Sequence, residues 1–269
     1  MSRVIVITSG KGGVGKTTVT ANLGTALARL GHRVAVVDAD FGLRNLDLLL
    51  GLENRVVYTA VEVITGECRL EQALVKDKRT PGLVLLPAAQ TRNKTAIGPE
   101  QMLDLVQRLA ADFEYVLIDC PAGIEQGFRN AIAGASEAII VTTPELSAVR
   151  DADRVVGLLE SAQVQPVRLI VNRLRPDMVA ANTMMSVEDV VELLAIPLLG
   201  MIPEDEEVIV STNKGEPLVL GEQRLTQAAA ALHRIAQRLN GQEVPFVDID
   251  SLNGGILQRL KRFLSQKVF

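Results

Sequence analysis

A glycine-rich segment with two lysines lies near the start of the chain, and its residue types suit the binding of phosphate groups. The segment reads Gly10-Lys11-Gly12-Gly13-Val14-Gly15-Lys16-Thr17-Thr18 and fits the pattern G-x-x-x-x-G-K-[ST]. Glycines let a backbone curl until successive N–H groups point inward at phosphate oxygens. We expect Lys16 to reach the β- and γ-phosphates of a nucleotide and the Thr17 hydroxyl to hold Mg²⁺.

The flanking sequence decides between this site and a glycine-rich turn that binds nothing. An apolar, strand-like run, Val4–Thr8, comes before the segment, and an amphipathic, helix-like stretch, Lys16–Leu30, follows it. The pattern arises by chance in roughly one chain in a hundred of this length, and the context makes a chance match rarer. A helix beginning at Lys16 also directs its positive end at the phosphates. The sequence therefore predicts a nucleoside triphosphate site with Mg²⁺.

Carboxylates follow two further apolar runs, where they would complete such a site. Val34–Asp38 ends in an acid and is followed by Asp40, and Tyr115–Asp119 ends in another acid. The i, i+2 spacing of Asp38 and Asp40 places both side chains on one side of an extended chain. One of them can support the magnesium shell while the other orients water, and Asp119 would sit in the second shell of the metal. The alternative is a set of solvated loop acids.

Apolar runs alternate with amphipathic stretches along most of the chain. This alternation is typical of an α/β fold with a mostly parallel, twisted sheet and helices on both faces, a Rossmann-like three-layer P-loop NTPase. The strand-like runs are Val4–Thr8, Val34–Asp38, Leu83–Pro87, Tyr115–Asp119, Ala138–Thr142, Val167–Asn172 and Leu198–Ile202. The helix-like stretches are Lys16–Leu30, Pro99–Asp112, Glu125–Ala133, Ser147–Ser161, Ser186–Leu194 and Arg224–Asn240. Ligands bind at the carboxyl ends of such strands, where Asp38, Asp119 and Asn172 stand.

The composition limits the class of protein. Of 269 residues, 48% are hydrophobic and 22% are charged, as in an ordinary folded globule, and a net charge of −4 argues against broad binding to nucleic acid. No apolar run reaches the ~18 residues that span a bilayer, and the chain begins with a strand instead of a targeting segment. We therefore expect a soluble, cytoplasmic protein. Cys68 and Cys120 have no metal-ligand spacing, and reduced thiols are favoured over a disulfide, which would imply secretion.

The first lysine of the phosphate loop carries a resemblance to a known family. The run Lys-Gly-Gly-Val-Gly-Lys-Thr resembles the deviant Walker A motif of the MinD/ParA family of ATPases. The resemblance implies that Lys11 reaches across a nucleotide-sandwiched homodimer to the partner's phosphates, whereas the alternative is a solvated loop lysine. It also implies a catalytic set of Lys11, Lys16 and Asp40, in which Asp40 positions the attacking water. Asp38, in the same first switch, and Asp119 would contact the metal through water.

The resemblance further implies a second switch and a base pocket. In the second switch, Gly123 would bring a backbone N–H to the γ-phosphate. The base contacts would come from Asn172 and Arg173 at the end of one strand, and from Pro203 and Asp205 after the next. The amide of Asn172 can both donate to and accept from an adenine edge, although a turn cap is the alternative for this residue. Asp205 would suit the donor edge of guanine, so the purine stays open, with ATP favoured.

Segments outside the phosphate site resemble the MinD branch of the family, and the resemblance covers nearly the whole chain. They are Gly42-Leu43-Arg44-Asn45-Leu46-Asp47, Lys78-Arg79-Thr80, Leu86-Pro87-Ala88, Gln90-Thr91-Arg92, Val149-Arg150-Asp151 and Ile202-Pro203-Glu204-Asp205. The resemblance implies an ATP-dependent homodimer that cycles on and off a membrane and places the cell-division site. A MinC-like division inhibitor and a MinE-like topology factor would be its partners, with residues 147–161 as their docking surface. A ParA-type DNA- or cargo-partitioning ATPase and a metabolic ligase or kinase are the competing interpretations.

The end of the chain differs in composition from the rest. We expect residues 1–240 to form the ATPase domain, 241–255 a flexible tether, and 256–269 an amphipathic helix whose apolar face is flanked by basic residues. The expected membrane contacts are Ile256, Leu257, Leu260, Phe263, Leu264, Arg259 and Lys261. The alternative is a terminal helix packed on the core. A membrane helix, which resembles the family's targeting sequence, would place the protein on the anionic inner face of the cell membrane, or at its plastid counterpart.

Overall fold

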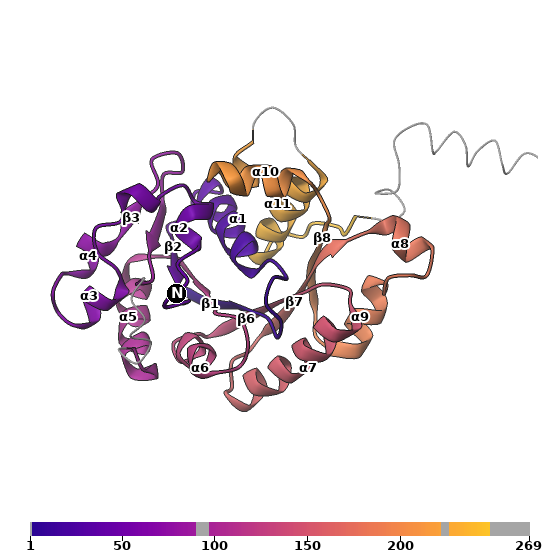
Figure 1. Cartoon of the computed structure of the whole chain (residues 1–269), viewed down its shortest axis with the longest axis horizontal. Coiled ribbons are helices and arrows are strands. Elements are labelled where there is room, and N and C mark those ends of the chain that lie inside the picture. Colours follow the sequence, from indigo (N-terminus) through magenta and orange to yellow (C-terminus); the bar gives the residue numbers. More distant parts are fainter. Residues whose placement is uncertain (1, 90–96, 222–225, 248–269) are drawn as a thin grey trace, which may run out of the picture.

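A sheet of eight strands forms the middle layer of the molecule (Figure 1). The computed structural model describes residues 2–89, 97–221 and 226–247. The strands are β1 (Arg3–Thr8), β2 (Val34–Asp38), β3 (Val75–Lys76), β4 (Leu83–Leu86), β5 (Tyr115–Asp119), β6 (Glu137–Thr142), β7 (Val167–Leu174) and β8 (Leu198–Pro203). Their order across the sheet is β3-β4-β2-β5-β1-β6-β7-β8. All neighbours pair in parallel except β3 with β4, which confirms the predicted α/β fold.

Helices cover both faces of this sheet, as Figure 1 shows. The helices are α1 (Lys16–Arg29), α2 (Leu46–Leu49), α3 (Ala60–Ile64), α4 (Leu70–Ala73), α5 (Pro99–Asp112), α6 (Gln126–Ile132), α7 (Leu146–Ser161), α8 (Pro176–Ala180), α9 (Val187–Leu194), α10 (Glu207–Lys214) and α11 (Gln227–Leu239). Helices α1 and α11 pack on one face together with α2 and α10, and α5, α6, α7 and α9 pack on the other. Helices α3 and α4 lie at the β3 edge, and α8 lies at the β8 edge.

The apolar composition of the central strands explains this three-layer arrangement. Successive side chains of a strand point to opposite faces, so a strand that is apolar throughout must be covered on both sides. In β1, Val4 and Val6 belong to the core under α5, α6, α7 and α9, whereas Ile5 and Ile7 belong to the core under α1 and α11. The strand that carries the phosphate loop is therefore fixed between two separate cores.

Strand β7 runs two residues beyond the end that the sequence predicts. The expected strand stops at Asn172, whereas β7 continues to Leu174. Its pairing with β8 shifts register between Val171 and Leu174, and Arg173 between them has a φ of 56°. A bulge of this kind adds a residue to one strand and redirects the side chains near it. Alternation alone does not reveal the bulge, so the sequence predicts the strand end too early.

The short elements of the fold were not predicted from the sequence. They are β3, α2, α3, α4, α8 and α10, together with the 3-10 turns at Glu53–Arg55 and Leu218–Leu220. Helix α10 is the longest of them, and its β-branched residues disfavour a helix by propensity. Local contacts compensate: the Asp205 carboxylate accepts from the Glu207 N–H at 3.0 Å, and Gly215 ends the helix with a φ of 63°.

The chain leaves α11 in contact with the body of the molecule. The Arg238 guanidinium donates to the carbonyl oxygens of Val244 and Pro245, both at 2.8 Å, and stacks on the Phe246 ring at 4.0 Å. The first residues of the predicted tether are therefore fixed, and the predicted membrane segment 256–269 lies outside the described residues. In the part of the chain that is described, no helix has the length and apolar character needed to cross a membrane.

Candidate nucleotide site

The carboxyl ends of β1, β2 and β5 bring the predicted site residues together. These strands are neighbours in the sheet, and the register pairs Ile7 of β1 and Asp38 of β2 with Asp119 of β5. The phosphate loop follows β1 directly and ends in α1. Because parallel neighbours end at the same edge, the loop and both buried acids meet there. The structure confirms this proximity, which the sequence predicted from the strand ends alone.

Backbone conformation and close packing explain why glycine stands at three positions of the phosphate loop. Gly13 and Gly15 have φ values of 78° and 100°, in the left-handed region that other residues avoid. A Cβ at Gly15 would also lie 2.3 Å from Nδ2 of Asn172. A Cβ at Gly10 would lie 2.2 Å from the carbonyl carbon and oxygen of Asp151 in α7. The loop is therefore held against β7 and α7, with no room for side chains at these two contacts.

Asp119 is buried among the first residues of α1. Its carboxylate accepts from the Thr20 hydroxyl at 3.0 Å, and the Thr17 hydroxyl also bonds to it. Burial raises its pKa to about 6, although Thr17, Lys16 and Thr20 all favour the charged form. Lys16 itself is buried. The sequence interpretation missed Thr20, but its position one turn after Lys16, on the same side of the helix, was a signal that it faces this site.

Asp38 holds the first-switch loop by its carboxylate. The backbone N–H groups of Asp40, Asn45 and Leu46 donate to it at 3.0, 3.3 and 3.2 Å. Burial and the neighbouring charge of Asp119 raise the pKa of Asp38 to about 8, against the effect of those donors. Two adjacent buried carboxylates with raised pKa values form a site that a cation would stabilise.

The donor set at this edge fits Mg²⁺ bound together with phosphate. Mg²⁺ prefers oxygen ligands and usually keeps several waters, with one or two protein ligands beside the substrate phosphates. Thr17, Asp38 and Asp119 supply such oxygens in one place. Across residues 2–89, 97–221 and 226–247, no group of three or more His, Cys, Asp or Glu side chains is arranged to hold a metal ion alone. The site therefore suits a metal that arrives with its nucleotide.

The raised pKa values predict how pH affects the stability of the protein without nucleotide or metal. The folded state keeps protons on Asp38 and Asp119 above the ordinary pKa of 3.8, up to about 8 and about 6. Between these limits the folded state binds more protons than the unfolded state, so stability falls as pH rises. We expect the Tm to decrease from pH 5 to pH 8, and to decrease less in Asp38→Asn. Calorimetric scans can measure both slopes, with Asp104→Asn, at an exposed position of α5, as the control; equal slopes in all three proteins would contradict the assignment.

A cavity of about 670 Å³ extends from the phosphate loop to the predicted base pocket. Asn172, Arg173, Pro203 and Asp205 all line it, together with Gly15 and Thr18. Nδ2 of Asn172 donates to the Val14 carbonyl oxygen at 2.8 Å. Asn172 therefore supports the loop, and its contact with a base stays a prediction.

Asp205 has structural partners of its own at the rim of this cavity. One carboxylate oxygen accepts from the Glu207 N–H at 3.0 Å and the other accepts from the Ala228 N–H at 3.4 Å. These bonds fix the start of α10 against α11. Asp205 therefore has a structural role at this rim, and ATP as the nucleotide stays a prediction.

The remaining predicted residues stand around the phosphate end. Nζ of Lys11 lies 3.3 Å from Oε2 of Glu145 and 3.1 Å from the Ser147 hydroxyl, at the start of α7. The backbone of Asp40 is fixed by Asp38, and Gly123 has a φ of 88° with open space where a Cβ would be. The sequence held no local signal for the Lys11 contacts, because their partners lie more than a hundred residues away.

Both cysteines are free thiols, as predicted. Cys120 is buried beside Asp119, and burial raises the pKa of its thiol to about 12. A thiol with so high a pKa is neutral at ordinary pH and is a poor nucleophile or metal ligand. Cys120 therefore acts as a small apolar residue in the core.

Comparison with known proteins identifies the family. The family model described as the CobQ/CobB/MinD/ParA nucleotide binding domain matches residues 5–218. This chain belongs to the MinD/ParA family. The matched region contains the phosphate loop and the acids Asp38, Asp40 and Asp119, so the predicted family and its P-loop NTPase fold are confirmed.

Relatives over the full length belong to the MinD branch of the family. The septum site-determining protein MinD of a Synechocystis strain is 63% identical over 264 residues, 98% of this chain and 99% of the relative. A MinC:MinD cell division protein complex from Aquifex aeolicus contains a chain with 48% identity and a TM-score of 0.85, covering 92% of this chain and 99% of that one. The septum site-determining protein MinD of Pyrococcus horikoshii, solved with Mg-ADP, has 32% identity and a TM-score of 0.81, with coverages of 89% and 96%.

Proposed function

We propose that this chain is an ATP-dependent, homodimerising ATPase that cycles on and off a membrane and places the cell-division site by recruiting a division inhibitor. The observation that carries the proposal is the full-length relation, at 63% identity, to a septum site-determining protein MinD. The second lysine of the phosphate loop and the basic amphipathic end of the chain support it from the sequence. Hydrolysis of ATP to ADP and phosphate would release the protein from the membrane.

The site residues give each step of hydrolysis a candidate group. The buried Lys16 and the loop N–H groups would bind the phosphates, and Thr17 would hold Mg²⁺, with Asp38 and Asp119 contacting it through water. The metal would neutralise charge on the phosphate oxygens. Asp40, whose backbone is fixed by Asp38, would orient the attacking water, and the open backbone at Gly123 would donate to the γ-phosphate.

Lys11 is the residue that would make hydrolysis depend on a second copy of the chain. It is bound to Glu145 and Ser147, but this pair is exposed, with 42% and 57% of the Lys11 and Glu145 side chains accessible. An exposed ion pair contributes little, on the order of 0–1 kcal/mol. Lys11 can therefore leave these partners and bind the phosphates of a partner subunit at small cost. Its positive charge would then stabilise the negative charge of the phosphate that is transferred.

Replacing Lys11 with alanine tests the cross-subunit role. Lys11→Ala is expected to bind ATP and remain monomeric, because the partner's phosphates lose their second lysine. Light scattering with ATP and Mg²⁺ measures the mass of the particle directly. Lys76→Ala, at an exposed lysine of β3, removes the same charge elsewhere and should dimerise like the unmodified chain. A dimer that persists in Lys11→Ala would exclude the role.

Membrane binding would follow from dimerisation through avidity. A short amphipathic helix is marginal in water and binds lipid weakly. Two such helices on one dimer make the second insertion intramolecular, which raises the overall affinity by ~10²–10⁴-fold. Sedimentation with vesicles that contain phosphatidylglycerol tests this coupling. We expect the protein to pellet with ATP and to stay in the supernatant with ADP; equal pelleting with either nucleotide would contradict the proposal.

Helix α7 is the candidate docking surface for a MinC-like inhibitor and a MinE-like activator. The solved relative in a MinC:MinD complex supports a partner of the first kind. Arg150, Asp153 and Arg154 are exposed on α7, and Asp151 pairs with Arg154 at 3.7 Å. The competing function, DNA or cargo partitioning of the ParA type, would need a basic surface for DNA, whereas the chain carries a net charge of −4. Sedimentation with duplex DNA in place of vesicles distinguishes the two.

A further inference from the structure

A second cavity lies at the amino ends of the strands, whereas the nucleotide site lies at their carboxyl ends. It has a volume of about 600 Å³ and is formed where the loop after α1 meets the turn before β4. Arg29, Arg33 and Arg79 line it, together with His32. No acidic side chain of the described residues belongs to its lining, although acids outnumber basic residues in the chain as a whole. Two carboxylates lie just behind this lining, Glu114 at 3.0 Å from the His32 ring and Asp77 at 3.2 Å from Arg79, so the lining keeps an excess of positive charge from Arg29 and Arg33.

Thr80, one of the residues that line the cavity, has a buried hydroxyl without a partner in the part of the chain that the structure describes. Thr80 lines the cavity and is 1% exposed, and its Oγ1 makes no hydrogen bond with any described residue. A buried polar group without a partner loses its hydrogen bonds to water and gains none in return, so such groups are rare in folded proteins. An anion in the cavity would give this hydroxyl an acceptor.

The positive charge of the cavity is only partly used by the protein itself. Arg79 is paired with Asp77 and donates to the carbonyl oxygens of Leu50 and Gly215, so it acts mainly as a clamp. Arg29 donates one of its five N–H groups, to the Val219 carbonyl oxygen at 2.6 Å. The side chain of Arg33 makes no hydrogen bond or ion pair within the described part of the chain.

The C-terminal end of α1, which carries partial negative charge, lies beside this cavity and would repel an anion. Three carbonyl oxygens of its last turn are already hydrogen-bonded to backbone N–H groups. The last turn of a helix leaves carbonyl oxygens unpaired, which repel anions. In α1 the carbonyls of Ala26, Leu27 and Ala28 accept from the N–H groups of Leu30, His32 and Gly31, at 2.9–3.3 Å. These caps reduce the repulsion, and the guanidinium groups carry full charges beside it.

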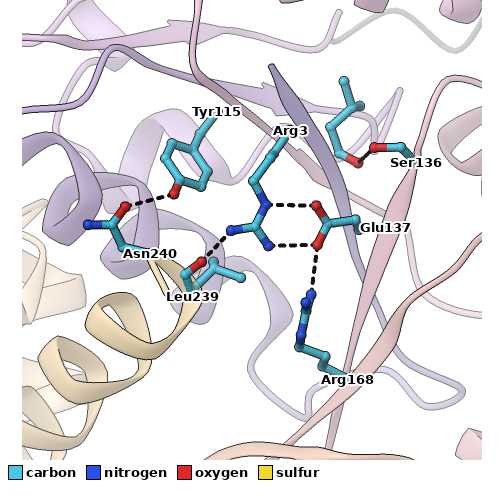
Figure 2. Close-up of polar contacts among 8 residues, drawn as sticks. Arg3, Tyr115, Ser136, Glu137, Arg168, Leu239 and Asn240 are labelled. Carbon is cyan, nitrogen blue, oxygen red and sulfur yellow. Dashed lines mark hydrogen bonds and ion pairs between the residues drawn. The ribbon is translucent and has the colours of Figure 1, made fainter. Parts of the chain in front are cut away.

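The cavity shares its edge of the sheet with the end of α11. The His32 ring packs against the Tyr115 ring, with 5.1 Å between centroids, and the Tyr115 hydroxyl bonds to Asn240 at 3.1 Å. Arg3 fixes the preceding residue, Leu239, by its carbonyl oxygen and pairs with Glu137 (Figure 2). After α11 the chain turns back along the helix, and Phe246 and Val247 line a small pocket with Pro203 of β8 and Gln227 of α11, away from this cavity.

We propose that this cavity binds the phosphate group of an anionic ligand, either a phospholipid headgroup or a free phosphate compound. Arg33 and Arg29 supply charge-assisted donors, which are the strongest available to a phosphate, and Thr80 supplies its unused hydroxyl. The lipid as source rests on the proposed membrane function. The anion site itself does not depend on that function.

The histidines allow the cavity to be observed directly. The chain has two of them, and His32 lines the cavity. Helix α1 spans 14 residues, or about 20 Å, between the phosphate loop and this end, so phosphate bound at the loop should not change the ring signals of His32. Inorganic phosphate is titrated into the full-length protein with saturating Mg·ADP, at fixed pH and at an ionic strength held constant with sodium chloride. We expect a saturable shift of the His32 signals in nuclear magnetic resonance spectra.

Matched substitutions decide whether the shift comes from the cavity. Arg33→Gln should raise the half-saturating phosphate concentration at least about tenfold, and Thr80→Val about fivefold. The fold should survive Arg33→Gln, because the hydrogen bonds of residue 33 to residue 114 use its backbone. Arg108→Gln removes the same charge at an exposed position of α5 and should leave the titration unchanged. A shift that does not saturate, or that is identical in Arg33→Gln, would overturn the proposal.

Vesicles separate the two sources of phosphate. If the ligand is a lipid headgroup, Arg33→Gln should need several-fold more phosphatidylglycerol than Arg108→Gln for half-maximal sedimentation with ATP. If the ligand is a free phosphate compound, the two variants should sediment alike while the His32 titration still responds. Should the protein fail to bind vesicles at all, the membrane function would be wrong, and the phosphate titration would still judge the cavity.

Discussion

Replacing Gly10 with alanine is expected to lower the affinity for Mg·ADP by at least about a hundredfold. The added Cβ would lie 2.2 Å from the carbonyl carbon and oxygen of Asp151, closer than any real contact. The obstacle is backbone inside the long helix α7, which cannot rotate away as a side chain does. The phosphate loop must therefore shift, and a displacement of about 1 Å at a site of aligned donors costs on the order of a hundredfold.

A neighbouring glycine provides the control for this experiment. A Cβ at Gly12 would meet Ala122 at 3.6 Å, an ordinary contact, and the φ of Gly12 is not in the left-handed region. Gly12→Ala should therefore bind Mg·ADP within about threefold of the unmodified chain, since it removes no donor of the loop. Isothermal calorimetry measures both affinities, and circular dichroism checks that both variants fold. Equal affinities for the two variants would show that contact with α7 does not set the shape of the loop.

Removal of the residues after Asn253 is expected to abolish ATP-dependent sedimentation with anionic vesicles. The deleted residues include the apolar face and basic flanks of the proposed membrane helix. Because two weak anchors act together on a dimer, losing them should cost the full ~10²–10⁴-fold gain from avidity. Nucleotide binding should be unchanged, since the phosphate loop and α11 remain. Vesicle pelleting and calorimetry on the same preparation measure the two properties.

Two substitutions that each add a negative charge test whether the apolar face of the segment enters the membrane. The helical periodicity of residues 256–269 places Leu260 on the apolar face and Gln258 on the opposite side. Leu260→Glu should prevent sedimentation, whereas Gln258→Glu, with the same added charge, should weaken it only by about fivefold. Equal loss in both variants would indicate simple electrostatic attraction in place of an inserted face.

The nucleotide site was predictable because its parts are short and local in sequence. The loop motif, the acids at Asp38 and Asp119, and the rule that parallel strands end together were enough to bring these residues to one edge. The contacts of Lys11 with Glu145 and Ser147 were not predictable, because they depend on how α7 lies beside the loop. The same holds for Gly10, whose tight contact with α7 no spacing in the sequence reveals.

The role of Asn172 shows a second limit of prediction from the sequence. Its position at a strand end and its amide suggested contact with a base, which stays a prediction, whereas the structure shows the amide donating to the Val14 carbonyl oxygen in the phosphate loop. Both interpretations need an amide at the same place, so residue type cannot separate them. Helix α10 shows a third limit, because capping by Asp205 and Gly215 overrides the strand propensity of its residues.

The central position of β1 affects where the chain can tolerate insertions and sequence changes. Strand β1 pairs with β5 on one side and β6 on the other and is far from both edges of the sheet. Central strands exchange their amide hydrogens only when a whole domain opens, whereas peripheral elements open at lower free energy. Insertions and sequence drift are therefore best tolerated near β3 and α8, at the two margins. The phosphate loop, which follows β1 directly, is therefore attached to the part of the sheet that opens least often.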